Sequence, residues 1–382
     1  MHVLIVSNGY PTVKDPQWGC FERDQALALK KLGHEVAILY VDKRFRKYWR
    51  KIGVKHFTED DISVFGIFLF PMLGLRNITP KFHFRLVTLM QEKVFKSVLK
   101  YWGKPDIIYA HYIYNIAFAT KLKEKYNLPL VGMEHWSELT KVNLPPLLRY
   151  WGETAYTKAD ELLAVSESLQ SHIYRHFGKE STVVYDMLGQ EFVSSDVKKK
   201  ENTQPFRFIA VGSLIHRKGF DLLLRAFCKS ELKEKGCSVV IIGGGPEKDN
   251  LIDLAKQLNI SDNVNLVGRK TKGEIISAMQ DSHVFVLSSR AETFGVVCIE
   301  ALSQGLPNVA TICGGPEEFI NEQNGILVPS EDVKALSEAM VKIYNNYSKY
   351  DSVAIAEECK RRFVPQVIAN QLTTIFETVI NK

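Results

Sequence analysis

The sequence lacks any cysteine arrangement typical of a metal site or a disulfide framework. Its six cysteines form no C-x-x-C pair and do not cluster with histidines, and most of them stand in apolar runs. We therefore interpret the cysteines, Cys298 among them, as reduced core residues of a protein in a reducing compartment. They supply no candidate metal ligand.

Long hydrophobic runs are also missing. No stretch of about 18 apolar residues occurs, so the sequence predicts no membrane-spanning helix. The apolar segment Val3–Val6 is too short for the core of a signal peptide. These absences predict a cytoplasmic protein.

A complete dinucleotide-binding fingerprint is absent as well. The glycine run Gly243–Gly245 follows an apolar strand, but Pro246 comes next and Lys248 occupies the position of the last glycine. The run fits a tight turn from strand to helix near a ligand better than it fits an NAD site. The sequence therefore predicts no nicotinamide cofactor.

What the sequence does contain is a repeated alternation of apolar strands and amphipathic helices. The alternation runs twice along the chain and lapses over residues 187–205, which are polar and rich in charge. It is typical of α/β folds with doubly wound parallel sheets, which bind ligands at the carboxyl ends of their strands. We predict two such domains, residues 1–186 and 205–360, facing each other across a cleft. A C-terminal helix at about 365–382 is expected to pack back on the first domain.

Two glutamates bracket the turn that follows a predicted strand of the second domain. Glu292 precedes Thr293, and Glu300 stands eight residues after Glu292 on the next helix. Thr293 is expected to cap that helix, whose free N–H groups can then hold a phosphate. The N–H groups concerned are those of Phe294, Gly295 and Val296. Because a carboxylate repels a phosphate, the two acids should face hydroxyl groups on either side of it, as a nucleotide sugar provides.

A basic pair in the first strand-to-helix loop of the same domain supplies the positive charge that a diphosphate needs. Arg217 and Lys218 stand there, and Gly219 lets the following helix begin close to the ligand. Basic pairs in loops are often simply solvated. Their placement at the carboxyl end of the domain's first strand favours a contact with the ligand.

These motifs resemble those of retaining glycosyltransferases of the GT-B fold, specifically glycosyltransferase family four. The family's E-x7-E signature corresponds to Glu292 and Glu300, and its lysine–glycine loop to Lys218 and Gly219. The strand that ends in the family's active-site histidine is similar to "PDIIYAH", which ends in His111.

Two longer segments extend the resemblance to nearly the whole chain. Residues 7–40 resemble the family's acceptor-side first loop and helix, and residues 314–332 resemble its late donor-domain turn. Two segments depart from the family pattern. Ser213 stands where many members have arginine, so Arg217 is expected to carry part of the diphosphate contact. Residues 185–187 replace the usual Pro-Asn-Gly, so no contact is carried over there.

The resemblance implies a role for each part of the site. The family's first glutamate contacts the transferred sugar and its second the ribose, which assigns these roles to Glu292 and Glu300. Lys218 and Arg217, with the helix N-terminus at Gly295, would stabilise the leaving diphosphate. The second domain would bind the donor and the first the acceptor. No D-x-D cluster is present, so we expect transfer without a metal ion or other cofactor.

Other residues are weaker candidates. His135 ends the strand after the one that carries His111, and it joins Asp15 and Gly19 of the first loop as a candidate for the acceptor side. Backbone groups near Arg269 are candidates for contacts with the base. Ordinary alternatives exist: a strand-end histidine satisfied by backbone groups, and a solvated loop aspartate.

The sequence therefore predicts an enzyme that transfers a sugar from a nucleoside-diphosphate sugar to an acceptor hydroxyl, with retention at the anomeric carbon. Cell-surface polysaccharide or glycolipid synthesis is the expected setting. Two alternatives stay open. A GT-B epimerase or phosphorylase would use the same fold, and a non-catalytic sensor or scaffold would bind the nucleotide sugar without turnover.

Positive charge is concentrated in the first half of the chain. The net charge is +6, and residues 1–190 hold 26 Lys and Arg against 19 Asp and Glu. Residues 43–51 carry six cations among aromatic side chains, and residues 81–104 predict a basic amphipathic helix. We expect this strip to dock on an anionic membrane with a lipid-linked acceptor, rather than on a nucleic acid. A solvated helix face is the alternative.

Overall fold

The computed structural model describes residues 1–44, 53–69, 80–197 and 205–382. The chain divides into two compact units. Unit 1 consists of Met1–Tyr185 together with Pro365–Lys382, and unit 2 consists of Asp186–Val364. Both are α/β units, as the alternation of strands and helices predicted.

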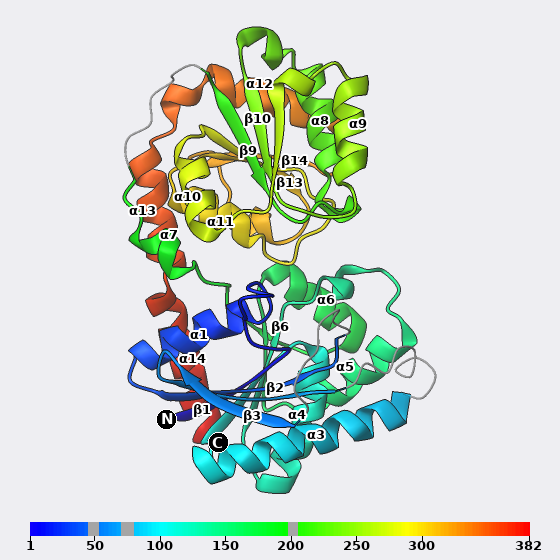
Figure 1. Ribbon diagram of the computed structural model, residues 1–382, viewed down its shortest axis with the longest axis vertical. Helices are drawn as coiled ribbons and strands as arrows, with labels where there is room; N and C mark the ends of the chain where they lie inside the picture. Colours follow the sequence, from blue (N-terminus) through cyan, green and yellow to red (C-terminus); the bar gives the residue numbers. More distant parts are fainter. Residues whose placement is uncertain (45–52, 70–79, 198–204) are drawn as a thin grey trace. The chain divides into compact units, whose positions relative to one another are not determined.

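Unit 1 is built on an eight-stranded sheet in the order β3-β4-β2-β1-β5-β6-β7-β8. Apart from the pair β3 and β4, neighbouring strands run parallel. Helix α1 packs against α14, while α3 packs against α4 and α4 against α5. Figure 1 shows α1 and α14 on one side of this sheet and α3 on the other. The strands are β1 His2–Ser7, β2 Glu35–Asp42, β3 Val54–Glu59, β4 Ile62–Phe68, β5 Ile107–His111, β6 Leu130–Glu134, β7 Glu161–Ala164 and β8 Thr182–Val183. The helices are α1 Cys20–Lys31, α3 Pro80–Tyr101, α4 Ile113–Tyr126, α5 Pro146–Lys158, α6 Glu167–Phe177 and α14 Pro365–Ile380.

The edge of the unit 1 sheet departs from the predicted parallel arrangement. Strands β3 and β4 form an antiparallel hairpin whose turn residues Asp60 and Asp61 have φ values of 51° and 58°. A two-residue turn can join only antiparallel strands, and positive φ at both positions is the geometry of a tight hairpin. Strand β3 is mostly exposed, so it lacks the apolar run by which the other strands are recognised.

Helix α14 belongs to unit 1 although most of that unit lies far earlier in the chain. His34 Nε2 and Thr373 Oγ1 are 2.8 Å apart, and the rings of Tyr109 and Phe376 meet edge to face with centroids 5.1 Å apart. Gln371 also donates a hydrogen bond of 3.0 Å to the carbonyl of Val183. The helix therefore covers part of the core formed by β5 and α1.

Unit 2 is built on a six-stranded parallel sheet in the order β11-β10-β9-β12-β13-β14. Its core runs through α8, α9 and α12, which pack on one another and on the sheet. The strands are β9 Arg207–Val211, β10 Ser238–Ile242, β11 Val264–Gly268, β12 Val284–Leu287, β13 Asn308–Ile312 and β14 Gly325–Pro329. The helices are α7 Gln190–Ser194, α8 Phe220–Lys229, α9 Lys248–Gln257, α10 Lys272–Gln280, α11 Val296–Ser303, α12 Val333–Asn345 and α13 Ser352–Phe363.

The segment predicted as a linker, 187–205, is not a linker throughout. It contains the short helix α7, in which Phe192 is 1% exposed. Gln304 donates hydrogen bonds to the Phe192 carbonyl and accepts one from Ser195. Phe192, together with the buried Met187 and Leu188, thus fixes the first part of a segment whose overall composition is polar.

No helix in the described ranges combines the length and the hydropathy that crossing a bilayer requires.

Candidate active site

The centre of the unit 2 site is a buried carboxylate that holds a lysine. Glu292 lies beyond the carboxyl end of β12 and is 5% exposed. Its Oε1 accepts hydrogen bonds of 2.6 Å from Lys218 Nζ and 2.6 Å from Ser289 Oγ. Arg217 Nη1 lies 3.7 Å from Oε2 of the same carboxylate. The structure therefore brings together the three charged residues that the sequence predicted for the sugar and the diphosphate.

The lysine loop approaches the end of β12 so closely that only glycine fits behind it. Gly219 has φ 63°, and a Cβ placed there would lie 1.9 Å from the carbonyl oxygen of Ser288. Lys218 ends a short 3₁₀ turn over His216–Lys218, and α8 begins directly after Gly219. This close approach aims the Lys218 side chain at Glu292.

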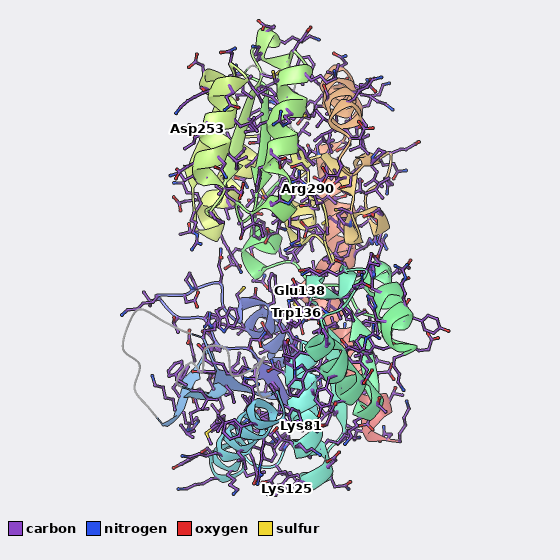
Figure 2. All side chains as sticks on the ribbon, turned by 90° about the vertical axis from the view of Figure 1, so that its right-hand side faces the viewer. Lys81, Lys125, Trp136, Glu138, Asp253 and Arg290 are labelled. Carbon is purple, nitrogen blue, oxygen red and sulfur yellow. The ribbon has the colours of Figure 1, made fainter. Side chains whose placement is uncertain are left out.

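Arg290 joins the two loops that carry these residues. Its Nη1 and Nη2 donate hydrogen bonds of 2.8 Å each to the two carboxylate oxygens of Asp221, and Nη1 also reaches the carbonyl of His216 at 2.6 Å. Its backbone N–H donates to the carbonyl of Arg217 at 2.8 Å. Burial tends to raise the pKa of Asp221, but the paired guanidinium brings that pKa below its usual value. Figure 2 marks Arg290 in unit 2.

Arg290 and Asp221 were not among the residues predicted from the sequence. The sequence contained a signal for both, because a charged residue stands three positions after the apolar strand β12 and an acid stands in the first turn of α8. Charges placed that close to a buried sheet edge need a partner.

The predicted helix cap at Thr293 is wrong. The N-cap of α11 is Gly295, with φ 92° and no side-chain cap, and the helix begins at Val296. The left-handed turn at Gly295 delays the start of the helix beyond the reach of Thr293. Pro316 Cγ would lie 3.1 Å from a Cβ at Gly295, so the turn is also tightly packed. The first turn of α11 and Glu292 belong to the same strand-to-helix connection.

Phe294 is a core residue, not a ligand-facing side chain. It is 1% exposed and packs with Phe319 and Phe363. Only its backbone can contribute to an anion site. Glu300 lies on α11, four residues after Val296, and is partly buried on the same face of the helix. Cys298 is fully buried and burial raises its pKa, which confirms its assignment to the core.

The glycine run forms a tight turn at the neighbouring strand ends. Gly243 donates a hydrogen bond of 2.9 Å to the carbonyl of Gly268, and Gly212 donates one of 2.9 Å to Ile242. The side chain of Arg269 lies against Gly244. Helix α9 begins only at Lys248. The structure thus confirms the prediction of a turn and gathers Arg269 with the glycines at the carboxyl ends of β9, β10 and β11.

The unit 1 site centres on His111, the last residue of β5. Its side chain is fully buried, and its Nδ1 lies 3.0 Å from Nε2 of His135 at the end of β6. Among the described residues Nε2 of His111 has no hydrogen-bond partner. Burial, reinforced by the nearby His135, holds the pKa of His111 well below its usual value, so this imidazole is neutral.

The backbone next to His111 is strained. Tyr112 has φ 68° and ψ 140°, a conformation that costs a non-glycine residue of the order of 1–3 kcal/mol. It is held by a hydrogen bond of 2.8 Å from its N–H to the carbonyl of Met133. Asn115 donates a bond of 2.9 Å to the carbonyl of His111. Strain maintained by specific contacts at a strand end is typical of functional sites.

A buried carboxylate near His111 and His135 was not predicted from the sequence. Glu22 on α1 is 2% exposed, and its Oε1 lies 3.0 Å from Ser7 Oγ. Burial raises its pKa, while backbone N–H groups and the nearby His135 act in the opposite direction. A glutamate three residues after Gly19 at the start of a helix resembles an ordinary first-turn acid, so its burial could not be predicted.

The remaining candidates of the first loop have structural partners. Asp15 Oδ2 accepts a hydrogen bond of 2.7 Å from Arg44 Nη1, and the Arg44 guanidinium stacks over Trp18 at 3.5 Å from the ring centroid. Gly19 is the N-cap of α1, with φ 80°. Contacts of Asp15 and Gly19 with a substrate stay predictions.

The sequence matches two family descriptions that together cover most of the chain. Residues 23–186 match Glycosyltransferase Family 4, and residues 193–358 match Glycosyl transferases group 1. The chain belongs to this glycosyltransferase family.

Relatives of this glycosyltransferase span its full length. It is 24% identical to N-acetyl-alpha-D-glucosaminyl L-malate synthase of Bacillus anthracis, with 100% of this chain and 98% of the relative covered. It is 25% identical to a putative teichuronic acid biosynthesis glycosyltransferase of Bacillus subtilis, with 90% of this chain and 89% of that one covered. Its fold is similar to that of HepE from Anabaena, solved in complex with UDP, with a TM-score of 0.74, 17% identity and 99% of each chain covered. The glycosyltransferase thus has the GT-B fold.

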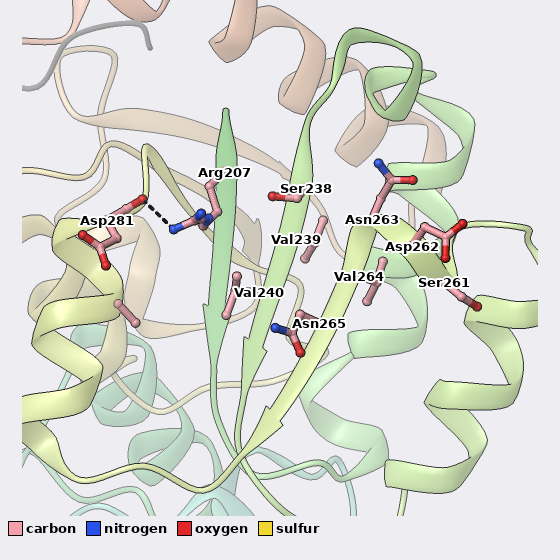
Figure 3. Close-up of a pocket in the computed structure, with 11 residues that line it drawn as sticks. Arg207, Ser238, Val239, Val240, Ser261, Asp262, Asn263, Val264, Asn265 and Asp281 are labelled. Carbon is pink, nitrogen blue, oxygen red and sulfur yellow. Dashed lines mark hydrogen bonds between the residues drawn. The ribbon is translucent and has the colours of Figure 1, made fainter. Parts of the chain in front are cut away.

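A surface pocket of unit 2 lies away from these residues. It has a volume of about 600 Å³ and opens beside the amino ends of β9, β10 and β11, where Arg207 donates a hydrogen bond of 3.2 Å to the carbonyl of Asp281 (Figure 3). Parallel sheets bind their ligands at the opposite, carboxyl ends. We therefore do not assign this pocket to the transfer reaction of the glycosyltransferase.

Proposed function

We propose that the protein transfers a sugar from a nucleoside-diphosphate sugar to an acceptor hydroxyl with retention at the anomeric carbon. The observation that carries the proposal is the Lys218–Glu292 contact of 2.6 Å beside the N-terminus of α11. A cation, an acid and free backbone N–H groups at one sheet edge suit a ligand that is both a diphosphate and a polyol. Family membership supports turnover over mere binding of the sugar nucleotide.

The diphosphate is the leaving group, so the site must stabilise the charge that grows on it. Lys218 and Arg217 supply positive charge, and the first turn of α11 supplies N–H donors. Lys218 donates a hydrogen bond to Glu292. A bound diphosphate competes for the lysine and frees the carboxylate to accept hydrogen bonds from sugar hydroxyls. Glu300, farther along α11, contacts the ribose.

His111 of unit 1 contacts a hydroxyl of the substrate through Nε2. The support for this contact is a fully buried, neutral imidazole with one nitrogen unpartnered among the described residues. A buried polar atom without a protein partner is the kind of group that a substrate satisfies.

The donor is expected to be recognised without a metal ion. A panel of UDP, GDP, ADP and CMP in a thermal-shift assay identifies the base, because a ligand at about 100 times its Kd stabilises its target by about 2.7 kcal/mol.

Turnover that persists in EDTA supports transfer without metal, and activity that returns only with added Mg²⁺ or Mn²⁺ contradicts it. The anomeric configuration of the product, read by NMR, tests retention.

The acceptor is proposed to be a lipid-linked saccharide presented on an anionic membrane. Helix α3 matches the predicted basic helix, and it exposes Phe82 and Leu89 (53% and 51%) among cations. These exposed cations are Lys81, Arg85, Lys93, Lys96 and Lys100. Of the segment 43–51, only residues 43 and 44 lie within the described part. Exposed apolar side chains among cations suit a lipid headgroup region.

Part of this charge is already compensated. Glu92 Oε1 lies 3.4 Å from Lys96 Nζ and 2.6 Å from Lys125 Nζ. Figure 2 marks Lys125 and Lys81 on unit 1. Membrane attraction would therefore rest chiefly on Lys81, Arg85, Lys93 and Lys100.

Liposome co-sedimentation tests the membrane proposal. We expect binding to anionic vesicles at low salt that weakens at high salt and on neutral lipid, because surface attraction is screened. The double variant Lys93→Glu/Lys100→Glu should bind less, and Lys334→Glu on unit 2 is the matched control. Binding that depends on neither salt nor lipid charge would contradict the membrane proposal, and the basic face would then be an ordinary solvated helix face.

A further inference from the structure

We propose that His135 and Glu22 are positioning residues that hold His111 in one tautomer, with its hydrogen on Nε2 and directed to a substrate hydroxyl. The proposal rests on the proposed function, in which His111 touches the substrate. It assigns to His135 a task within unit 1 rather than a direct acceptor contact. It also gives a purpose to a buried carboxylate that the transfer reaction does not otherwise use.

The geometry of the two imidazoles is that of an N–H···N hydrogen bond. The nitrogen atoms are 3.0 Å apart, the ring planes differ by 12° and the ring centroids are 5.2 Å apart. With nitrogens this close, such a centroid separation places the rings edge to edge and nearly coplanar. One hydrogen therefore lies between Nδ1 of His111 and Nε2 of His135. The direction of donation decides which tautomer His111 adopts.

Two buried carboxylates favour a hydrogen on His135. Glu22 and Glu134 are 2% and 0% exposed; burial raises the pKa of each carboxyl, and the nearby His135 acts in the opposite direction. Glu134 also fixes the turn that carries His135, because its Oε1 accepts the backbone N–H groups of His135 at 3.0 Å and Trp136 at 2.9 Å. Carboxylate oxygens near His135 favour a hydrogen on its imidazole, and an imidazole with that hydrogen on Nε2 donates to Nδ1 of His111.

His111 must then accept at Nδ1. Because His111 is neutral, it has one N–H, and this hydrogen lies on Nε2 when Nδ1 accepts. That is the nitrogen without a hydrogen-bond partner in the described part of the chain. Unsatisfied buried N–H groups are rare in folded proteins, and a substrate hydroxyl is the acceptor that completes this one. His111 is thus a hydrogen-bond donor and not a general base.

Nitrogen NMR of the full-length protein labelled with ¹⁵N-histidine reads the tautomer directly. The His111 signals are identified by their loss in His111→Gln. We expect a neutral imidazole with its hydrogen on Nε2 in the wild-type protein without substrate. A hydrogen on Nδ1 would overturn the proposal, and this measurement needs no variant that could fail to fold.

Two variants test the positioning roles. Glu22→Gln keeps the shape but removes the charge, and His135→Ala removes the donor; we expect both to shift His111 toward the Nδ1–H form. Their kcat should fall roughly tenfold, with an unchanged KM for the donor. His135→Gln, whose amide can donate to Nδ1, should restore part of the lost kcat. Glu138→Gln, at a partly exposed residue of the turn after β6, is the matched control and should change neither readout (Figure 2).

The outcomes separate the proposal from the proposed function. A tautomer unchanged in both Glu22→Gln and His135→Ala would overturn the positioning roles even if transfer activity is confirmed. Full turnover by His111→Ala would overturn the substrate contact of His111. Absence of any transfer by the wild-type protein would contradict the proposed function, while the NMR readout would still test the tautomer.

Discussion

Glu292 and Glu300 stand eight residues apart on one connection, but they have different surroundings. Glu292 is buried against Lys218, whereas Glu300 is partly exposed on α11. We expect Glu292→Gln to lower kcat at least a hundredfold while the Kd of the free nucleoside diphosphate stays within about twofold, because Lys218 remains available to the phosphates. Glu300→Gln should instead weaken the binding of the nucleotide. Calorimetric titration measures the Kd and initial rates measure kcat. An equal loss of diphosphate affinity in the two variants would contradict the assignment.

The charge of Lys218 has a separate consequence for the diphosphate. A hydrogen bond to a charged group contributes about 1.5–3 kcal/mol. Lys218→Ala should therefore weaken the binding of the nucleoside diphosphate by roughly tenfold to a hundredfold. The nucleoside alone should bind as before. Lys334→Ala, at a lysine that is 73% exposed, is the control. A parallel loss of nucleoside affinity would show that Lys218 has a structural role.

Single residues also show where sequence reasoning failed. It found Glu292, Lys218 and His111 because each lies at or beyond the carboxyl end of an apolar strand. It missed Glu22 and Arg290, because their burial depends on partners from other segments: Ser7 for Glu22 and Asp221 for Arg290. It assigned a cap to Thr293, because propensity alone does not show that Gly295 turns left-handed first.

At the scale of elements, the Arg290–Asp221 pair connects β12 to α8. Because the pKa of Asp221 is lowered in the folded state, the pair adds stability above the unfolded-state pKa, near 3.9, and loses it as the pH falls further. At pH 6, Asp221→Asn should therefore have a lower melting temperature than the wild-type protein. This difference in melting temperature should shrink toward pH 3. The same variant should raise the KM for the donor, since the lysine loop loses its anchor. A difference in melting temperature that is independent of pH would contradict the ion pair.

Helix α14 provides a second test at this scale. Phe376 is fully buried against Tyr109, so Phe376→Ala should cost about 3–5 kcal/mol in the stability of unit 1. Val367→Ala, on the same helix at a residue that is 41% exposed, is the matched control. Chemical denaturation followed by the signals of the two units should show the loss in unit 1 alone. Equal destabilisation of both units would contradict the assignment of α14.

The main elements of the fold could be predicted because buried parallel strands are continuous apolar runs. The β3–β4 hairpin could not, since β3 is exposed and its turn uses two aspartates in place of the usual Asn-Gly. Helix α7 was hidden in a polar segment, because a single residue, Phe192, provides its burial. Local composition carries little information about an element that has one buried side chain.

For the whole molecule, two compact units predict two thermal transitions. Each unit has its own sheet and core, so a single two-state description does not apply. A nucleoside diphosphate at about 100 times its Kd should stabilise unit 2 by about 2.7 kcal/mol and so raise the transition temperature of that unit only. Differential scanning calorimetry with and without ligand measures this. A shift confined to the other transition would place the diphosphate in unit 1.

The return of α14 to unit 1 sets an order of events during synthesis. The ribosome releases Tyr109 and β5 long before Phe376, and all of unit 2 is made in between. At about 5–20 residues per second, the first sheet waits roughly ten seconds or more for its last helix. Unit 2, uninterrupted in the chain, can fold during that wait. The half that begins first is thus completed last, and until then the apolar surface destined for α14 is open to chaperones.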